Sequence, residues 1–108
     1  METKTFQHTL PTGEEIEYRV TRRTDMDSEA DFGVMYGGVV PMYAVLVAYP
    51  AGIDLGAFRM DDAYPCEEIT AWLGEVVGEP VRFVDCGYSS ADGESAYEVW
   101  NFRAGAAD

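Results

Sequence analysis

The sequence PCEEITAWLGEVVG at residues 65–78 has the apolar period of an amphipathic α-helix. Its large apolar side chains recur at intervals of three and four residues and so form one continuous stripe. The stripe consists of Ile69, Trp72, Leu73, Val76 and Val77. Pro65 suits the first helical position, and Gly78 suits the residue that ends a helix. We therefore predict a helix between these two residues that packs on another element, with Trp72 and Leu73 at the centre of the contact.

Strand-like segments precede this helix. The most apolar run of the chain, VVPMYAVLVAY at residues 39–49, predicts a central strand that begins after Pro41. Residues 5–10 and 16–21 each alternate between apolar and polar side chains, with a Pro-Thr-Gly turn between them. This pattern predicts a β-hairpin within residues 3–24.

Residues 25–38 show neither a helical nor a strand period, and we predict an acidic loop there. After the helix, residues 80–88 and 96–103 are again strand-like, with the turn-forming sequence SSADG at residues 89–93 between them. We therefore predict a second hairpin over residues 80–103.

The order of these elements, β-β-β-α-β-β, indicates an α+β domain. We expect a mostly antiparallel sheet with the amphipathic helix packed on one face. The chain is long enough for a single domain, residues 1–108, with its own hydrophobic core. Seven Tyr, five Phe and two Trp residues exclude a disordered acidic tail, because such a tail would lack aromatic side chains.

The net charge of −13 is concentrated in the later part of the chain. Residues 1–23 carry four acidic and four basic side chains, whereas residues 24–108 carry sixteen acidic and three basic ones. Such a charge favours solubility, and it also attracts positively charged partners. The candidate partners are a metal ion, a basic peptide and a protein surface that holds nucleic acid. The alternatives are a plain solvated surface and adaptation to salt.

Side chains suited to catalysis are sparse in this sequence. His8 is the only histidine, and no nucleophile motif frames Cys66, Cys86 or a serine, so we expect these side chains to be structural. Two cysteines and one histidine are too few for a zinc site, and the sequence lacks the glycine motifs that bind phosphate. We therefore expect no enzymatic activity and no cofactor.

The acidic loop also contains the pattern DxDxExD, which imitates the start of an EF-hand calcium site. Ala30 stands where the sharp turn requires glycine, and Tyr36 stands where the bidentate glutamate belongs, so we expect no metal there. No apolar run approaches the roughly 20 residues that span a bilayer, and the first residues lack the apolar segment of a signal peptide. We therefore expect a cytoplasmic protein that makes no membrane contact.

The same acidic pattern points to another chemistry. In an extended chain, residues two apart lie roughly 6–7 Å apart on one side, so these acids would form a row of negative charges. The row consists of Asp25, Asp27, Glu29 and Asp31. Duplex DNA also offers regular negative charge, about one per 1.7 Å of its axis. A protein with such rows can occupy a DNA-binding cleft in place of DNA, whereas the alternative is a solvated acidic loop.

A further pattern follows the central strand, which opens near Tyr43. Residues 49–58, YPAGIDLGAF, have the form Tyr-x-x-Gly-x-x-x-Gly-x-aromatic, and the acidic helix leads from them to VDCGY at residues 84–88. Residues 43–88 thus resemble the first domain of the ArdA-type antirestriction proteins. In that family a Tyr-Asn-x-Gly-x-x-x-Gly-x-Trp loop, an acidic helix and an Asp-x-x-Gly-aromatic strand end follow one another. The resemblance implies an acidic mimic of duplex DNA that inhibits type I restriction–modification enzymes.

We therefore expect a DNA-mimic inhibitor, encoded by a phage or mobile element and acting in the cytoplasm of the bacterial host. It would occupy the nucleic-acid-binding cleft of a basic defence complex, a restriction enzyme or a CRISPR effector, without binding nucleic acid itself. The sequence leaves a homodimer open. The alternative function is that of an immunity-type protein that neutralises a basic toxin. The expected partner-binding residues are Asp25, Asp27, Glu29, Asp31, Asp54, Asp61, Asp62, Glu68 and Glu75.

Overall fold

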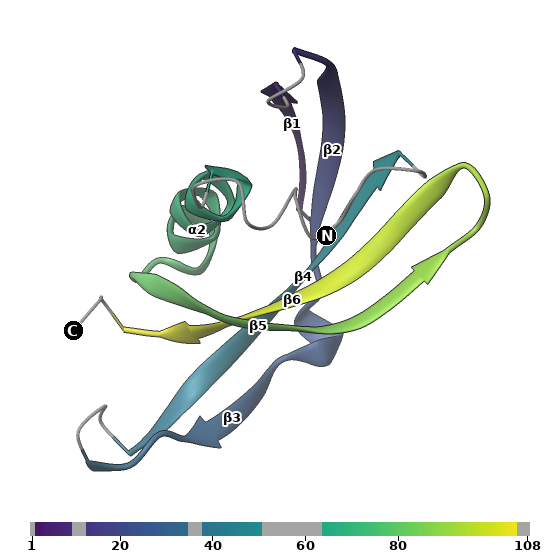
Figure 1. Cartoon of the computed structure of the whole chain (residues 1–108). Coiled ribbons are helices and arrows are strands. Elements are labelled where there is room, and N and C mark those ends of the chain that lie inside the picture. Colours follow the sequence, from purple (N-terminus) through teal and green to yellow (C-terminus); the bar gives the residue numbers. More distant parts are fainter. Residues whose placement is uncertain (1, 10–12, 35–37, 51–63, 106–108) are drawn as a thin grey trace.

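In the residues that it describes, the computed structural model shows a mostly antiparallel sheet with one α-helix (Figure 1). The structure describes residues 2–9, 13–34, 38–50 and 64–105. Its elements are, in chain order, β1 (Thr3–Thr9), β2 (Glu15–Arg22), the 3-10 helix η1 (Thr24–Met26), β3 (Ser28–Asp31), β4 (Val39–Pro50), α2 (Tyr64–Val77), β5 (Val81–Ala91) and β6 (Ser95–Ala104). The predicted architecture is confirmed, whereas the predicted order β-β-β-α-β-β is wrong because it lacks one strand.

Strand β4, which is twelve residues long, forms the centre of the sheet. One of its edges pairs with β6 from Met42 to Pro50. Its other edge is shared by two strands, because β3 pairs with Val39–Met42 and β2 pairs with Val45–Ala48. The strand order is therefore β1-β2-β4-β6-β5, with β3 beside the first part of β4 (Figure 1).

Strand β3 and η1 lie in the segment 25–38, for which the sequence predicted a loop. The sequence of β3, SEAD, has no apolar alternation, because this strand is held by its backbone pairing with β4 and buries none of its side chains fully. The same pairing sets the start of β4 at Val39, and not after Pro41 as predicted. Pro41 is tolerated there because it lies near the beginning of its strand.

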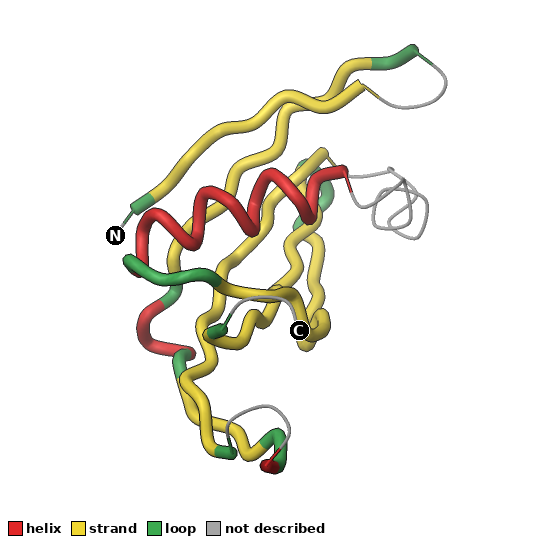
Figure 2. Tube along the Cα trace, turned by 90° about the vertical axis from the view of Figure 1, so that its left-hand side faces the viewer, coloured by secondary structure: helices red, strands yellow, loops and turns green. Residues whose placement is uncertain are grey.

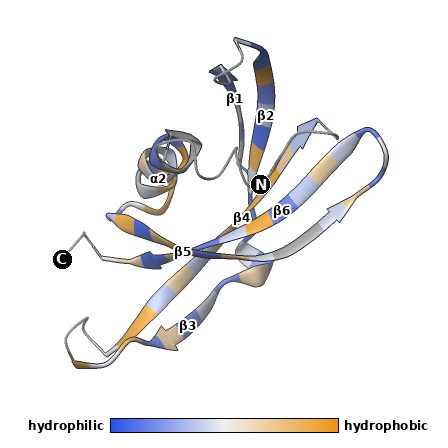
Figure 3. Cartoon of the chain, in the orientation of Figure 1, coloured by the Kyte–Doolittle hydropathy of each residue, from blue (hydrophilic) through white to orange (hydrophobic). Residues whose placement is uncertain are grey.

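Helix α2 covers one face of the sheet, and its apolar stripe forms the core with that face (Figure 2). Ile69 and Leu73 are fully buried, and the partly buried Trp72 packs edge-to-face on Phe6 with 6.3 Å between the ring centroids. The strands contribute alternate residues, because successive side chains point to opposite faces; the alternation is visible along β2 in Figure 3. The main strand residues in the core are Phe6, Ile16, Tyr18, Val20, Val45, Val47, Tyr49, Trp100 and Phe102.

The helix ends where the sequence predicts. Gly78 follows Val77 with a φ of 81°, a conformation that glycine adopts without strain. The N–H groups of Gly78 and Glu79 both donate to the carbonyl of Gly74, at 2.9 and 3.2 Å. These bonds satisfy the last turn and direct the chain into β5.

The two predicted hairpins are present, but the second turn is displaced. β1 pairs with β2, and β5 pairs with β6. β5 continues to Ala91 and β6 begins at Ser95, so the turn comprises residues 92–94 and overlaps only the end of the predicted turn at residues 89–93. At two places the register shifts, and β5 has an extra residue relative to β6 at each of them. A prediction that assumes a regular strand does not include these extra residues, so it ends β5 too early. The Asp92 carboxylate then fixes the turn by accepting the N–H of Ser95 at 2.8 Å.

Candidate acidic interface

The pairing register divides the charged side chains between two faces of the sheet. We call the face that packs on α2, which contains Val45 and Val47, the helix side, and we call the opposite face the open face. The strand pairing places three arginines on the open face, namely Arg19, Arg82 and Arg103. Acidic residues accompany them there, namely Glu15, Glu17 and Asp85. The open face therefore mixes charges of both signs.

Acidic side chains dominate the helix side. Glu67 and Glu75 are exposed on α2, and the exposed Glu79 follows the end of the helix. The two acids of β3, Glu29 and Asp31, lie on this side because their partners in β4 have odd numbers. The core residues of β4 also have odd numbers, so they point to the same side. We call these five residues the helix-side acids.

The basic residues of the helix side leave little positive charge near α2. Arg22 is only 6% exposed, and its guanidinium binds both carboxylate oxygens of Asp27, at 2.7 and 2.5 Å. Lys4 is exposed on β1, with its Nζ 5.1 Å from the ring centroid of Phe6, on which Trp72 packs, so it contributes one positive charge beside α2. Among the residues that the structure describes, the exposed charge around α2 is therefore mainly negative.

Helix α2 carries acidic side chains at the end where they are least favourable. The helix dipole places partial negative charge at the C-terminus, so a cation is favoured there and an acid loses about 0.3–1 kcal/mol. The last turn has no basic residue; it contains Glu75, and Glu79 lies two residues after the last helical residue, Val77. Side chains that weaken their own helix in this way are expected at functional sites.

A chain of contacts holds Glu79 in place. The hydroxyl of Tyr43 donates to Glu79 Oε2 at 2.6 Å, and the guanidinium of Arg22 lies 5.2 Å from the centroid of the Tyr43 ring. The pKa of Tyr43 is raised, chiefly because its hydroxyl donates to Glu79 and secondarily because of burial. A hollow of about 620 Å³ adjoins these residues. It is lined by Glu2, Arg22, Thr24, Tyr43, Val76 and Val77.

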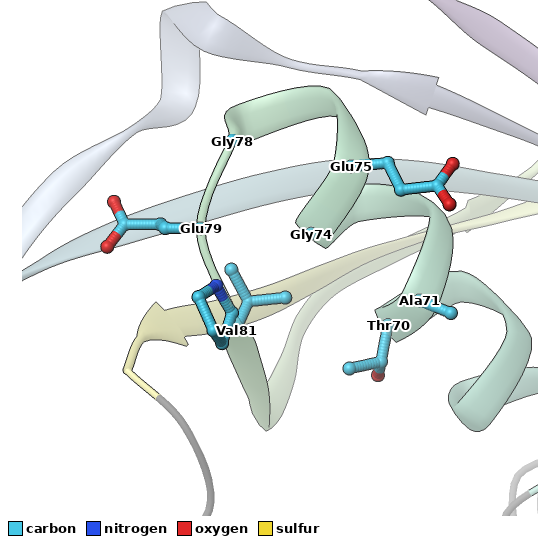
Figure 4. Close-up of a pocket in the computed structure, with 8 residues that line it drawn as sticks. Thr70, Ala71, Gly74, Glu75, Gly78, Glu79 and Val81 are labelled. Carbon is cyan, nitrogen blue, oxygen red and sulfur yellow. The ribbon is translucent and has the colours of Figure 1, made fainter.

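A second hollow, of about 540 Å³, lies between the C-terminal half of α2 and the start of β5 (Figure 4). Small and apolar residues line it, among them Ala71, Gly74 and Val81. Glu75 and Glu79 also line it, and their carboxylates point in opposite directions. A lysine or arginine side chain of a partner has the matching chemistry, since it combines an aliphatic stem with a cationic end.

The structure breaks the predicted row of four acids. Asp25 lies in η1 and accepts two hydrogen bonds from Arg23, at 2.9 and 2.7 Å, and these bonds are the main reason why the pKa of Asp25 is lowered. Asp27 binds Arg22 and also accepts the N–H of Ala44 at 3.1 Å. Both carboxylates are therefore paired within the chain, and the extended geometry assumed for the row is wrong.

The other predicted partner-binding residues have different surroundings. Glu29 and Asp31 are exposed on β3, and Glu75 is exposed on α2. Glu68 is half-buried on the same helix and accepts the hydroxyl of Tyr18 at 3.0 Å, so it helps to attach α2 to β2. Three predicted residues lie outside the described part of the chain, namely Asp54, Asp61 and Asp62.

Two helix-side acids were not among the residues predicted to bind a partner, namely Glu67 and Glu79. The sequence contains a signal for Glu67, because Glu67 and Glu75 both lie outside the apolar stripe of the predicted helix. Glu79 lies beyond Gly78, which ends the helix, so the helical period gives no signal for it.

In the comparisons with known proteins, no family model, curated protein or solved structure matches this chain. The resemblance to the ArdA-type proteins therefore stays a prediction. Within the described residues, no group of three or more His, Cys, Asp or Glu side chains is placed to hold a metal ion. In that same part of the chain, no helix has the length and apolar character needed to cross a membrane.

Proposed function

We propose that this chain is an acidic DNA-mimic inhibitor that occupies the nucleic-acid-binding cleft of a bacterial defence protein, a restriction enzyme or a CRISPR effector. The helix-side acids take the place of phosphates in that cleft. The observation that supports this most directly is the position of Glu75 and Glu79 at the negative end of α2. Both acids weaken the helix, and a function that requires concentrated negative charge explains their presence.

The magnitude of the charge limits what electrostatics can contribute. The molecule is 42 Å long, and a duplex of this length carries about 25 charges at one per 1.7 Å. The net charge of −13 is about half of that number. Charge therefore supplies mainly steering and orientation, and the affinity needs apolar contacts as well. The hollow beside Gly74 offers such a contact directly next to the acids.

Competition with DNA tests the proposal. The full chain captures its partner from a bacterial lysate at low salt, and the bound protein is then offered duplex DNA. We expect DNA and this protein to exclude each other, and we expect the association rate to fall steeply as salt rises. Simultaneous binding of both, with no loss of affinity for either, would contradict mimicry.

Two triple variants with the same change in net charge locate the contact. Glu29→Gln, Glu67→Gln and Glu75→Gln together remove three helix-side acids. Glu15→Gln, Glu17→Gln and Glu94→Gln together remove three exposed acids from β2 and the β5–β6 turn. We expect the first variant to associate about tenfold or more slowly, and the second to change little. Equal losses in both would show that only the net charge matters.

The identity of the captured protein separates the two candidate functions. A toxin with a basic surface that does not bind DNA would favour the immunity-type alternative. A DNA-binding defence enzyme that loses its DNA to this protein favours mimicry.

A further inference from the structure

The outer strands of the sheet differ in how they are protected against pairing with another chain. Natural edge strands are blocked by shortness, charges, proline or bulges. Strand β3 is only four residues long and carries Glu29 and Asp31. Strand β5 contains two irregularities and carries Arg82 and Asp85. Strand β1, in contrast, is seven residues long with a continuous register, and Lys4 is its only charged residue at neutral pH when His8 is neutral.

The hydrogen bonding of β1 shows which of its backbone groups face outward. The carbonyl of Glu2 accepts the N–H of Arg22 at 2.8 Å, so this pair is a hydrogen-bonded pair of the β1–β2 ladder. Such pairs alternate with pairs whose backbone groups point away from the partner strand. The next pair, Thr3 with Thr21, is of the second kind, and its hydroxyl oxygens lie 3.2 Å apart. The outward N–H and C=O groups therefore belong to every second residue, namely Thr3, Thr5, Gln7 and Thr9.

The charge distribution favours this edge for contact between copies of the chain. Two molecules with a net charge of −13 repel each other over most of their surfaces. Residues 1–23 are the exception, because their four acidic and four basic side chains balance. The outward residues of β1 are uncharged, and within the described part of the chain no strand other than β2 pairs with β1.

We propose that two copies of this chain associate through antiparallel pairing of their β1 strands, which joins the two sheets into one. Pairing centred on Phe6 satisfies every outward backbone group from Thr3 to Thr9. It places Thr5 of one copy opposite Gln7 of the other, and Thr3 opposite Thr9. On the helix side the two Phe6 rings meet, and the Trp72 rings that pack on them become more deeply covered.

This arrangement is independent of the proposed inhibition, and it has one geometric consequence. A two-fold axis between antiparallel edge strands runs perpendicular to the sheet. Both α2 helices therefore lie on the same side of the joined sheet, and so do both sets of helix-side acids. A partner that binds them would meet a surface twice as long.

The mass of the full chain in solution tests the pairing, measured by sedimentation and light scattering from about 0.1 M to about 1 M salt. We expect a dimer that becomes stronger as salt rises, because screening removes the repulsion between the acidic bodies while each β1 brings only one charged side chain, Lys4, to the contact. A monomer at all salt concentrations, at the highest protein concentration that remains soluble, would overturn the proposal.

Two variants at the edge provide the matched comparison. Thr5→Pro removes an outward N–H without removing a bond to β2, and proline is tolerated on edge strands. We expect it to be monomeric with an unchanged circular dichroism spectrum. The double variant Thr5→Glu with Gln7→Lys keeps the net charge and places opposite charges across the interface, so we expect it to remain dimeric and to gain less from added salt than the unmodified chain. If either Thr5→Pro stays dimeric or the double variant becomes a folded monomer, the edge is not the interface.

Discussion

The helix side and the open face of the sheet use their charges in different ways. On the open face, Arg19, Arg82 and Arg103 are interspersed with acids, and the guanidinium of Arg103 lies 5.6 Å from the centroid of the Phe32 ring. On the helix side, the one buried arginine, Arg22, is bound to Asp27, and the exposed groups around α2 are mainly carboxylates. Among the described residues, exposed acids therefore outnumber exposed bases more strongly on the helix side than on the open face.

This difference suggests that the two faces serve different needs. A face with charges of both signs keeps the protein soluble without producing a strong electrostatic field. A face with mainly one sign of charge, including acids at the negative end of a helix, weakens the fold and provides long-range attraction. Substitutions on each face measure how much of the stability depends on that face and which of its charges are structural.

The largest expected effect concerns the apolar layer under α2. Leu73 is completely buried, so Leu73→Ala should lower the free energy of unfolding by about 2–5 kcal/mol. Leu46→Ala, on the open face, is the control; because Leu46 is only half-buried, we expect a smaller loss. Denaturant unfolding measures both. Equal losses would show that the open face is as tightly packed as the helix side.

The next effect separates two neighbouring ion pairs. Asp27→Asn leaves the buried guanidinium of Arg22 without its carboxylate, and we expect a loss of about 2–3 kcal/mol. This value is below the range for a fully buried pair because the Asp27 side chain is 28% exposed. Asp25→Asn removes the partner of the more exposed Arg23, and we expect little change in stability. A similar loss for both variants would show that Asp27 is more solvated than its contacts indicate.

The features that could be predicted from sequence are those recorded in local patterns. The helix over residues 64–77 has a stripe and a glycine stop, and the hairpin of β1 and β2 has strict alternation. Strand β3 has no such pattern, because it depends on backbone bonds to β4 and fully buries none of its own side chains. Strand β3 forms because β4 lies beside it, and the sequence of β3 alone carries no information about this neighbour.

The acidic character of the candidate site was visible in the sequence, whereas the location of its available acids was not. The acidic excess indicated a positively charged partner, yet the sequence did not show that Arg22 and Arg23 pair with Asp27 and Asp25. The contact of Tyr43 with Glu79 joins residues 36 positions apart, so it arises only from the tertiary structure. The sequence spacing identifies acids that lie on one face, but the ion pairs of the folded protein decide which of these acids remain available to a partner.

A smaller effect tests the position of acids along α2. Glu75→Gln removes an acid from the negative end of the helix, and we expect stability to rise by about 0.3–1 kcal/mol. Glu67→Gln removes an acid from the first turn, where it is favourable, and we expect a loss of similar size. Both variants change the net charge equally, so a shared shift would reveal general repulsion instead of a dipole effect. Thermal and denaturant unfolding at low salt measure the difference, and under the proposed function both should weaken partner binding.

The smallest effect uses a tyrosine–carboxylate pair on each face. Tyr43 donates to Glu79 on the helix side, and Tyr97 donates to Asp92 beside the open face, at 2.6 and 2.8 Å. In both cases this hydrogen bond is the first cause that raises the tyrosine pKa above 10.0, because an ionised tyrosine would lose the bond and face a carboxylate. The stability from each pair is therefore present below pH 10 and is lost as the pH rises through the folded pKa.

Absorbance of tyrosinate against pH measures these ionisations, with Tyr43→Phe and Tyr97→Phe identifying each contribution. Glu79→Gln should lower the ionisation pH of Tyr43 and leave that of Tyr97 unchanged, whereas Asp92→Asn should do the reverse. The comparison has a direct bearing on the helix side, because Glu79 is the acid that the Tyr43 bond holds next to the end of α2. If Glu79→Gln leaves the titration of Tyr43 unchanged, Glu79 is not fixed there in solution. The ordered acidic surface would then be limited to the acids carried by α2 and β3 themselves.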